Sequence, residues 1–529
     1  MLFTISGMKT FNTTGICRPN AHYMVDITDR LEIIRKMVAN GNYFCINRGR
    51  QYGKTTTLGS LKVYLENAGY SVFSISFEAV DDSYFQSQST LGAMFVRLLS
   101  LCIKKNKVKN LDAGCKDLML SFYDSHPTEC TLFDAKELMI QACSENTTPI
   151  VILIDEVDQA SEHESFLKLL GIFRDMYLNR DEEMAIKSII LAGVYDIKNL
   201  KLKVRPEEQH QYNSPWNIAV PFDVDMSLSA EGIAGMLAQY KADHSLNFDE
   251  KAVAQMIRDY TAGYPYLVSR ICQIMDAEQL TWDKCGVLKA VNAILVERNT
   301  LFDNMIKKLE EYPKLKHILK GILLSGNDSS YNPDEKYIQI ASMFNYVVNK
   351  EGKIAVACRI METRLYNLFI KEEENSVFYK QGQIDKSQFI HNGIIDMSHL
   401  LERFVVHMNQ TYKMDYDNAF IEDDARKVFL TYLRPIINGI GSYHIEEQTR
   451  DHDRMDVVID YLGKQYVIEL KIWRGNAYNE RGEEQLCRYL EYFDLHQGYL
   501  LSFCFNKNKK SGLLPPVTFR GRKLIEAIV

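Results

Sequence analysis

A continuous apolar run constrains the fold of this chain more than any other feature. Residues 150–154 read Ile-Val-Ile-Leu-Ile, follow Pro149 and end in Asp155 and Glu156. Apolar residues at every position are typical of a strand that is buried on both faces of a parallel sheet. Parallel strands require crossover connections, usually helices, so the run predicts an α/β domain. Its acidic end would lie where open α/β sheets bind ligands, although a solvated acidic turn is the simpler alternative.

A glycine-containing motif precedes this strand by about a hundred residues and follows the short apolar segment 43–46. It reads Asn47-Arg48-Gly49-Arg50-Gln51-Tyr52-Gly53-Lys54-Thr55-Thr56. A strand, such a turn and Gly-Lys-Thr at a helix start form the layout of a phosphate-binding P-loop. The first glycine of the usual pattern falls on Arg48, so a plain helix-capping turn is the alternative. The acidic strand supports the P-loop, because the two motifs together supply both halves of a nucleotide site.

This pairing predicts ATP and Mg²⁺ as ligands. Lys54 would reach the β- and γ-phosphates, while Thr55 and Asp155 would hold the metal ion. Glu156 would polarise the attacking water as general base. The residues expected to bind the nucleotide are Gly49, Arg50, Gln51, Tyr52, Gly53, Lys54, Thr55, Thr56 and Asp155.

Further strands and helices complete the expected α/β core. In residues 71–77, β-branched or aromatic side chains occupy every second position, which predicts a strand. Residues 188–194 predict another buried strand, and helices are expected over 91–105 and 133–143. In this order, the P-loop, the Asp-Glu strand and the Leu-Ala-Gly strand resemble the AAA-type P-loop ATPases. They resemble in particular bacterial proteins of this type that carry a nuclease-like C-terminal domain.

The resemblance implies further roles in the N-terminal half. Tyr195 or Asp196 would sense the γ-phosphate, and residues 214–222 would form the last core strand. Arginine-finger candidates are Arg174, Arg180 and Arg205, each of which also fits a solvated surface arginine. AAA-type ATPases often form rings, but without an assigned finger the resemblance only leaves a homo-oligomer open.

The middle of the chain is expected to be helical. Ser229 would cap an amphipathic helix, and Gly263-Tyr264-Pro265 would separate two helices, in the manner of the helical lid of AAA-type ATPases. Helices followed by a strand pair around residues 350–352 suggest a winged-helix-like module. We favour a role as an internal connector over a role in binding DNA. The polar stretch 372–382 is the expected domain boundary.

A second candidate site lies near the C-terminus. Residues 456–461 and 465–471 form a predicted hairpin around Leu462-Gly463. Alternate side chains of a strand point to the same face, so Glu469 and Lys471 share one face. Pairing of the two strands would bring Asp456 beside Glu469. Two carboxylates and a lysine would form a Mg²⁺ site for phosphodiester hydrolysis, with Asp456 and Glu469 as metal ligands. A surface hairpin with a Glu-Lys pair is the plainer alternative.

Asp456, Glu469 and Lys471 resemble the PD-(D/E)XK nuclease superfamily. Gln485 and Tyr489, one turn apart on an expected helix, resemble its Gln-x₃-Tyr motif. The resemblance implies a further catalytic glutamate, which maps to Glu422 on a predicted helix or alternatively to Glu446 on the preceding strand. It covers roughly residues 420–505.

The predicted architecture is therefore a P-loop NTPase with a parallel sheet and helical lid, a winged-helix-like connector, and a C-terminal α/β restriction-endonuclease-like domain. The expected divisions are 1–225, 226–305, 306–375 and 376–529. The length of 529 residues accommodates such domains, and eleven scattered cysteines with no CxxC pair favour a reducing cytoplasm over a disulfide framework. Apolar runs are too short to span a bilayer and no secretion signal is recognised. A net charge of −7 argues against general coating of nucleic acid, but not against a local basic groove.

These features predict an AAA-type ATPase that controls a Mg²⁺-dependent nuclease acting on DNA. A nucleotide-switched regulator that binds DNA or a protein without cutting is the alternative. An ATPase with a decaying C-terminal domain is a third, against which the intact Asp456, Glu469 and Lys471 speak.

Overall fold

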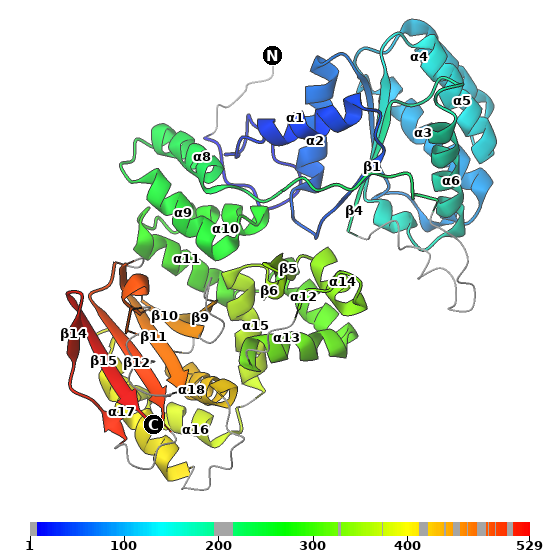
Figure 1. Ribbon diagram of the computed structural model, residues 1–529. Coiled ribbons are helices and arrows are strands. Elements are labelled where there is room, and N and C mark those ends of the chain that lie inside the picture. Colours follow the sequence, from blue (N-terminus) through cyan, green and yellow to red (C-terminus); the bar gives the residue numbers. More distant parts are fainter. Residues whose placement is uncertain are drawn as a thin grey trace. The chain divides into compact units, whose positions relative to one another are not determined.

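The computed structural model describes residues 8–194, 215–325, 330–372, 374–411, 422–437, 441–447, 455–462, 464–472, 483–484, 486–491, 494–504 and 511–529. It gives the backbone alone for 324–325, 422–425, 441–447, 455–456 and 472. The chain divides into two compact units (Figure 1). One comprises Met1–Leu228 with Met343–Asn345, and the other comprises Ser229–Ser342 with Tyr346–Val529.

The first unit contains a parallel four-stranded sheet with the order β1-β4-β3-β2. The strands are β1 (Phe44–Asn47), β2 (Ser71–Ser76), β3 (Ile150–Asp155) and β4 (Ser188–Gly193). Every residue of β3 and β4 is buried, as expected for strands covered on both faces. The prediction of a parallel α/β sheet is therefore confirmed.

Helices flank this sheet, with α1 and α2 on one side and α3 to α6 on the other in Figure 1. They are α1 (Thr28–Ala39), α2 (Lys54–Asn67), α3 (Gln88–Lys104), α4 (Ala113–Ser125), α5 (Leu132–Glu145) and α6 (Glu164–Leu178), with short 3₁₀ turns η1 (Asp82–Phe85) and η2 (Val157–Ala160). The helices predicted over 91–105 and 133–143 correspond to α3 and α5. Side chains from α3, α5 and α6 share one apolar core with β2 and β3.

The last core strand expected within 214–222 is wrong in its extent. Residues 215–218 form a turn, and only Val220 pairs with the sheet, through a single parallel bridge to Phe44. The Trp216 side chain is fully buried and stacks near Tyr43, with ring centroids 6.2 Å apart. Trp216 in this segment therefore contributes to core packing.

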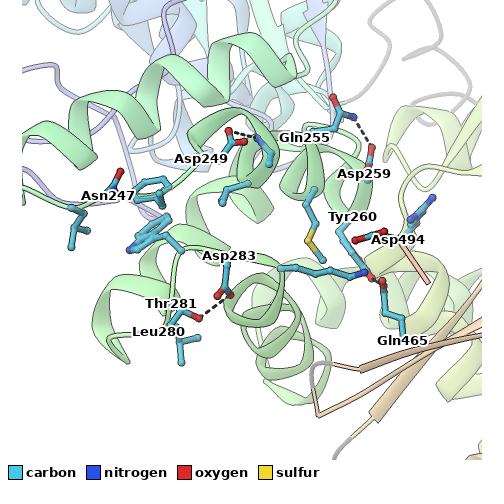
Figure 2. A pocket seen from close by; sticks show the side chains of 18 residues that line it. Asn247, Asp249, Gln255, Asp259, Tyr260, Leu280, Thr281, Asp283, Gln465 and Asp494 are labelled. Carbon is cyan, nitrogen blue, oxygen red and sulfur yellow. Dashed lines mark hydrogen bonds between the residues drawn. The ribbon is translucent and has the colours of Figure 1, made fainter. Parts of the chain in front are cut away.

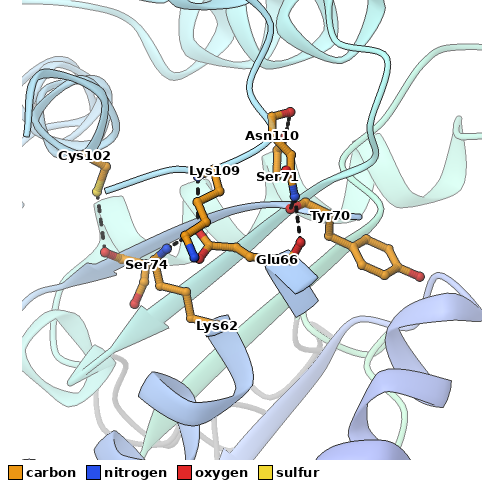
Figure 3. Close-up of polar contacts among 8 residues, drawn as sticks. All are labelled: Lys62, Glu66, Tyr70, Ser71, Ser74, Cys102, Lys109 and Asn110. Atoms are coloured by element: carbon orange, nitrogen blue, oxygen red, sulfur yellow. Dashed lines mark hydrogen bonds and ion pairs between the residues drawn. The ribbon is translucent and has the colours of Figure 1, made fainter. Parts of the chain in front are cut away.

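The far end of α2 is anchored by a buried carboxylate (Figure 3). Glu66 is 6% exposed, pairs with Lys62 and accepts a hydrogen bond from the Lys109 backbone N–H at 3.1 Å. Asn110 donates to the backbone oxygen of Glu66 at 2.7 Å and to that of Tyr70 at 3.1 Å. These contacts fix the helix that begins at the glycine-rich loop against the edge of the sheet.

The second unit begins with helices α8 (Ala230–Asp243), α9 (Glu250–Thr261), α10 (Pro265–Ala277) and α11 (Lys284–Val296). The predicted Ser229 cap is present, since its side chain accepts from the Gly232 N–H at 3.0 Å. The predicted break between helices is also present: α9 ends at Thr261, Gly263 has a φ of 71°, and α10 starts at Pro265. Pro at a first helical position leaves no hydrogen bond unmade.

Helices α12 (Thr300–Glu311), α13 (Pro313–Ser325) and α14 (Lys336–Met343) precede the antiparallel pair β5 (Val347–Lys350) and β6 (Lys353–Val356). Helix α15 (Arg359–Lys371) follows. The predicted strand pair around residues 350–352 is confirmed, while its assignment as a winged-helix-like connector stays a prediction.

The polar stretch 372–382 includes the start of α16 (Val377–Phe389), while its role as a domain boundary stays a prediction. Ser376 caps this helix by accepting from the Tyr379 N–H at 3.3 Å. Gly382, the last residue of that stretch, lies where α16 meets α18 (Glu422–Ile437). A Cβ there would lie 2.2 Å from the Tyr432 carbonyl oxygen. The glycine is required by close helix packing and not by a turn.

A mixed sheet with the order β13-β15-β12-β11-β10-β9 forms the C-terminal part of the second unit, with β14 paired to β15. Its strands are β9 (Gly441–Glu447), β10 (Met455–Tyr461), β11 (Lys464–Ile472), β12 (Gln497–Phe503), β13 (Gly512–Leu513), β14 (Val517–Phe519) and β15 (Arg522–Ile528). The remaining elements are β7 (Ile390–His391), β8 (Ile394–Ile395) and α17 (Met397–Thr411). Among the described residues, no helix is both long and apolar enough to cross a membrane.

Candidate functional site

The glycine-rich loop lies between the end of β1 and the start of α2. Gln51 and Gly53 have positive φ angles of 58° and 78°, and Gly53 is the residue before the helix. Gly49 does not have a positive φ. The sharp reversal of the backbone therefore depends on residues 51–53, and backbone N–H groups at the start of α2 favour an anion there.

Lys54 is the first residue of α2 and is only 7% exposed. Its Nζ donates to the backbone oxygens of Arg48, at 2.8 Å, and Gly49, at 3.1 Å. Burial lowers its pKa, and the charges of Asp158, Glu156 and Asp155 act in the opposite direction. The ammonium group is therefore held within the loop, close to the acidic end of β3.

Asp155 is the last residue of β3 and is 7% exposed. Its Oδ1 accepts a hydrogen bond from the Glu156 backbone N–H at 3.0 Å, and Glu156 itself has a φ of 53°. Burial raises the pKa of the Glu156 carboxyl, and the Asp155 charge raises it further. A raised carboxyl pKa is a property that general bases commonly have.

Asp158 belongs to the same site, although no role was predicted for it. Its Oδ2 accepts from the Val194 backbone N–H at 2.7 Å, which joins η2 to the end of β4. A Cβ at Gly193 would lie 2.8 Å from Asp158 Oδ1, so a larger residue there would press on this carboxylate. The position of Asp158 two residues after the acidic pair was the available signal.

Arg48 explains why the loop lacks its usual first glycine. Its Nη2 donates to the Val224 carbonyl at 3.0 Å, and its guanidinium lies 5.6 Å from the Phe222 ring centroid. Arg48 does not have a positive φ, so its backbone has no need of glycine. The side chain instead joins the loop to residues 222–224, and no local sequence pattern predicts this contact.

The other loop residues differ in their surroundings. Thr55 and Arg50 are exposed, whereas Tyr52 is buried. The Thr56 hydroxyl accepts from the Cys17 backbone N–H at 3.1 Å, which attaches the segment before α1 to the loop helix. The residues 49–56 and Asp155 thus surround one edge of the sheet with buried cationic and acidic groups, which fits a nucleotide with a divalent cation.

The predicted sensor and finger residues are only partly described. Tyr195, Asp196 and Arg205 lie outside the described residues. Arg180 donates to the Gly41 carbonyl at 3.0 Å and lies over the Tyr177 ring, so it has partners within its own unit. Arg174 is half-buried on α6.

The C-terminal hairpin forms in the predicted register. Asp456 of β10 lies opposite Glu469 of β11, and on the other side opposite Glu446 of β9. The positions of Glu446, Asp456 and Glu469 therefore form one row across three adjacent strands. Glu422, the first residue of α18, is not part of this row.

Glu469 and Lys471 are 0% and 1% exposed. Lys471 lies opposite Ser502 of β12, whose hydroxyl donates to Glu526 Oε1 of β15 at 2.5 Å. In this register Glu469 lies opposite Leu500, and Leu500 lies opposite Glu526. Ser502 and Glu526 are thus further polar positions near the row, and they were missed from the sequence. The signal for Ser502 was a polar residue that ends the apolar run of β12.

A helical segment, 486–491, covers the same face of this sheet. Leu486, Cys487 and Leu490 pack with Val458 and Val467. Val467 is two residues from Glu469, so both belong to one face. Tyr489 is partly buried against this cluster, while Gln485 lies outside the described residues.

Among the side chains that the structure describes, no three His, Cys, Asp or Glu groups gather as a metal site. In the row of Glu446, Asp456 and Glu469, only Glu469 has a described side chain. The absence of a metal-binding group therefore does not apply to this row.

Comparisons with known proteins bear on the first part of the chain. A family model described as an AAA-like domain matches residues 17–372. No curated protein matches the chain. Among solved structures, the Walker-type ATPase PABY2304 of Pyrococcus abyssi has 15% identity and a TM-score of 0.48, covering 67% of this chain and 99% of that one. The ORC1 protein of Aeropyrum pernix in complex with DNA has 13% identity and a TM-score of 0.29, covering 66% and 94%.

At these TM-scores, neither structural similarity bears on the function. The family model alone spans more than half of the chain, and it includes the loop at Lys54 and the acidic end of β3. This protein therefore belongs to the AAA-like domain family and is an AAA-like P-loop ATPase.

Proposed function

We propose that this protein binds and hydrolyses ATP with Mg²⁺, and that nucleotide controls a metal-dependent nuclease of the PD-(D/E)XK type that acts on DNA. The single observation that carries the nuclease half is the register of β10 with β11, in which Asp456 lies opposite Glu469. Glu469 itself precedes Lys471 by two residues on β11. The ATPase half rests on the loop geometry around buried Lys54.

At the nucleotide site, residues 49–56 would hold the phosphates through backbone N–H groups and Lys54. Thr55 and Asp155 would hold Mg²⁺, which neutralises charge on the transferring phosphoryl group. Glu156, whose pKa burial raises, would accept a proton from the attacking water. The Glu156 conformation, in the left-handed region, is a strained arrangement of a kind that clusters at active sites.

At the C-terminal sheet, Asp456 and Glu469 would bind the metal ion and Lys471 would orient a water molecule or stabilise developing negative charge. A bound metal ion lowers the pKa of its water. The row of Glu446, Asp456 and Glu469 supports Glu446 as the further glutamate, because Glu422 lies on a helix outside the row. Tyr489, with Gln485, is proposed to line the same centre.

The decisive experiment measures cleavage of single- and double-stranded DNA with Mg²⁺, in the presence and absence of ATP. Glu469→Gln keeps the side-chain volume and removes the charge, so we expect cleavage to fall at least about 100-fold while ATP hydrolysis continues. Lys471→Ala is expected to behave similarly. Lys464→Ala, on the same strand but exposed, is its matched control. RNA substrates test the choice of nucleic acid.

Cleavage by Glu469→Gln at the wild-type rate would refute the assignment of the metal site. For the first unit, Lys54→Ala is expected to lose ATP binding, whereas Lys105→Ala, an exposed residue that follows α3, is expected to keep it. Wild-type protein that hydrolyses ATP and cuts no nucleic acid would leave only the ATPase half.

A second function is favoured by the complete burial of Glu469 and Lys471. In this alternative the C-terminal sheet binds DNA or a protein and does not cut, and nucleotide switches that binding. Lys471→Ala with unchanged biological activity, beside an inactive Lys54→Ala, would support the alternative.

A further inference from the structure

A buried polar contact joins helix α9 to the β10–β11 hairpin. The Tyr260 hydroxyl donates to Asp460 Oδ2 at 2.5 Å, and Gln465 Nε2 donates to the Tyr260 oxygen at 3.3 Å. All three side chains are buried, and the Asp460 side chain is 0% exposed. Tyr260 and Gln465 line one end of a cavity of 850 Å³ (Figure 2).

This contact is at one end of the hairpin whose other end carries the candidate nuclease residues. Asp460 lies opposite Gln465, and Asp456 lies opposite Glu469 in the same register. Four residues along a strand span about 13 Å and return to the same face of the sheet. Asp460 therefore lies on the same strand and the same face as Asp456, at the end of the hairpin that contacts α9.

Four elements meet at Asp460. Besides Tyr260 of α9 and Gln465 of β11, the positive charges of Lys284 and Arg359 act on its carboxyl. Lys284 is the first residue of α11, and Arg359 is the first residue of α15. A buried carboxylate tolerates few arrangements of its donors, because each lost hydrogen bond leaves part of its charge unsolvated.

We propose that Tyr260 is a positioning residue for the candidate nuclease centre, and that it transmits the state of the AAA-like region to the C-terminal sheet. This inference rests on the proposed function. Tyr260 lies within residues 17–372, which match the AAA-like family, whereas the hairpin lies outside them. Through Asp460 and Gln465, a shift of α9 is passed to the strand that carries Asp456.

The test is Tyr260→Phe, which removes the hydroxyl and keeps the ring. The second unit offers a matched control, because Tyr240 of α8 donates to Asp276 Oδ1 of α10 at 2.6 Å, a hydrogen bond between two helices. Tyr240→Phe therefore removes an equivalent Tyr–Asp hydrogen bond. Asp460→Asn is the conservative variant, since its amide oxygen still accepts from Tyr260.

Two quantities are measured on the full chain: the ratio of DNA cleavage rates with and without ATP, and hydrogen exchange of residues 455–472 with and without nucleotide. We expect Tyr260→Phe to bind ATP as the wild type does, to keep KM for DNA, and to lose about 5-fold or more of the ATP response in kcat. Its hairpin should no longer change exchange rate on nucleotide binding. Tyr240→Phe and Asp460→Asn should retain the response.

An unchanged ATP response and unchanged hairpin exchange in Tyr260→Phe would overturn the inference. If the wild-type protein cuts no nucleic acid, the proposed nuclease fails, and hairpin exchange then decides the inference alone. A nucleotide effect on residues 455–472 that Tyr260→Phe abolishes upholds the link; an effect that is absent from the wild type, or equal in both proteins, refutes it.

Discussion

Asp460 is expected to make the stability of the second unit depend on pH. Burial raises the pKa of its carboxyl to about 6, an effect that the hydrogen bonds from Tyr260 and Gln465 and the charges of Arg359 and Lys284 only partly offset. An unfolded chain has an Asp pKa of about 3.9. The folded state therefore prefers the protonated acid. The stabilisation by this proton is complete below about pH 4 and is lost as the pH rises through about 6.

The magnitude follows from the displacement of the pKa. It amounts to about 2 pKa units, and each unit corresponds to about 1.4 kcal/mol. Ionised Asp460 at pH 8 thus costs up to about 3 kcal/mol relative to the protonated form. Asp460→Asn removes the charge and retains an acceptor for Tyr260, so it should abolish this contribution.

Urea unfolding of the full chain at pH 5 and pH 8 measures the effect. The free energy of unfolding of the second unit should fall from pH 5 to pH 8 by about 1 kcal/mol more in the wild type than in Asp460→Asn, because pH 5 lies about one pKa unit below the folded-state pKa. Hydrogen exchange of α9 and β10 identifies the transition that reports on this region. Asp494→Asn, at an exposed position on the same cavity, is the control and should follow the wild type. Parallel pH profiles for wild type and Asp460→Asn would refute the reasoning.

Three further outcomes are expected. Lys54→Met keeps the apolar stem of the side chain and removes the ammonium group. Calorimetric titration should show ATP affinity reduced by about 10-fold or more, since hydrogen bonds to charged groups contribute about 1.5–3 kcal/mol. An unchanged affinity would contradict the role of Lys54 in phosphate binding. Gly382→Ala forces a Cβ against the Tyr432 carbonyl, so thermal unfolding should reveal a loss of about 1–3 kcal/mol, and an unchanged midpoint would disprove the close packing. Asp158→Ala removes the acceptor of the Val194 N–H, so ATP hydrolysis should fall more than ATP binding does; equal losses would argue against a role in the chemical step.

Much of the fold could be predicted because secondary structure depends on local periodicity. The uniformly apolar residues of β3 indicated a strand covered on both faces, and period two in β10 and β11 predicted the hairpin and the pairing of Asp456 with Glu469. The start of α16 within 372–382 was not predicted, because that stretch is polar and lacks periodicity. Gly382 packs there against a distant helix. Its role is set by Tyr432, fifty residues later, with which no local pattern connects it.

The candidate sites divide in the same way. Motif spacing alone was sufficient to single out Lys54, Asp155 and Glu469, because each chemistry requires particular residue types at particular separations. The contacts of Arg48 with residue 224 and of Asp158 with residue 194 required the folded chain. The contact between Tyr260 and Asp460 did so even more, because it joins residues 200 positions apart. The periodicity of apolar residues indicates which face of each segment is buried. The partner of a buried polar group is determined only when distant segments pack together.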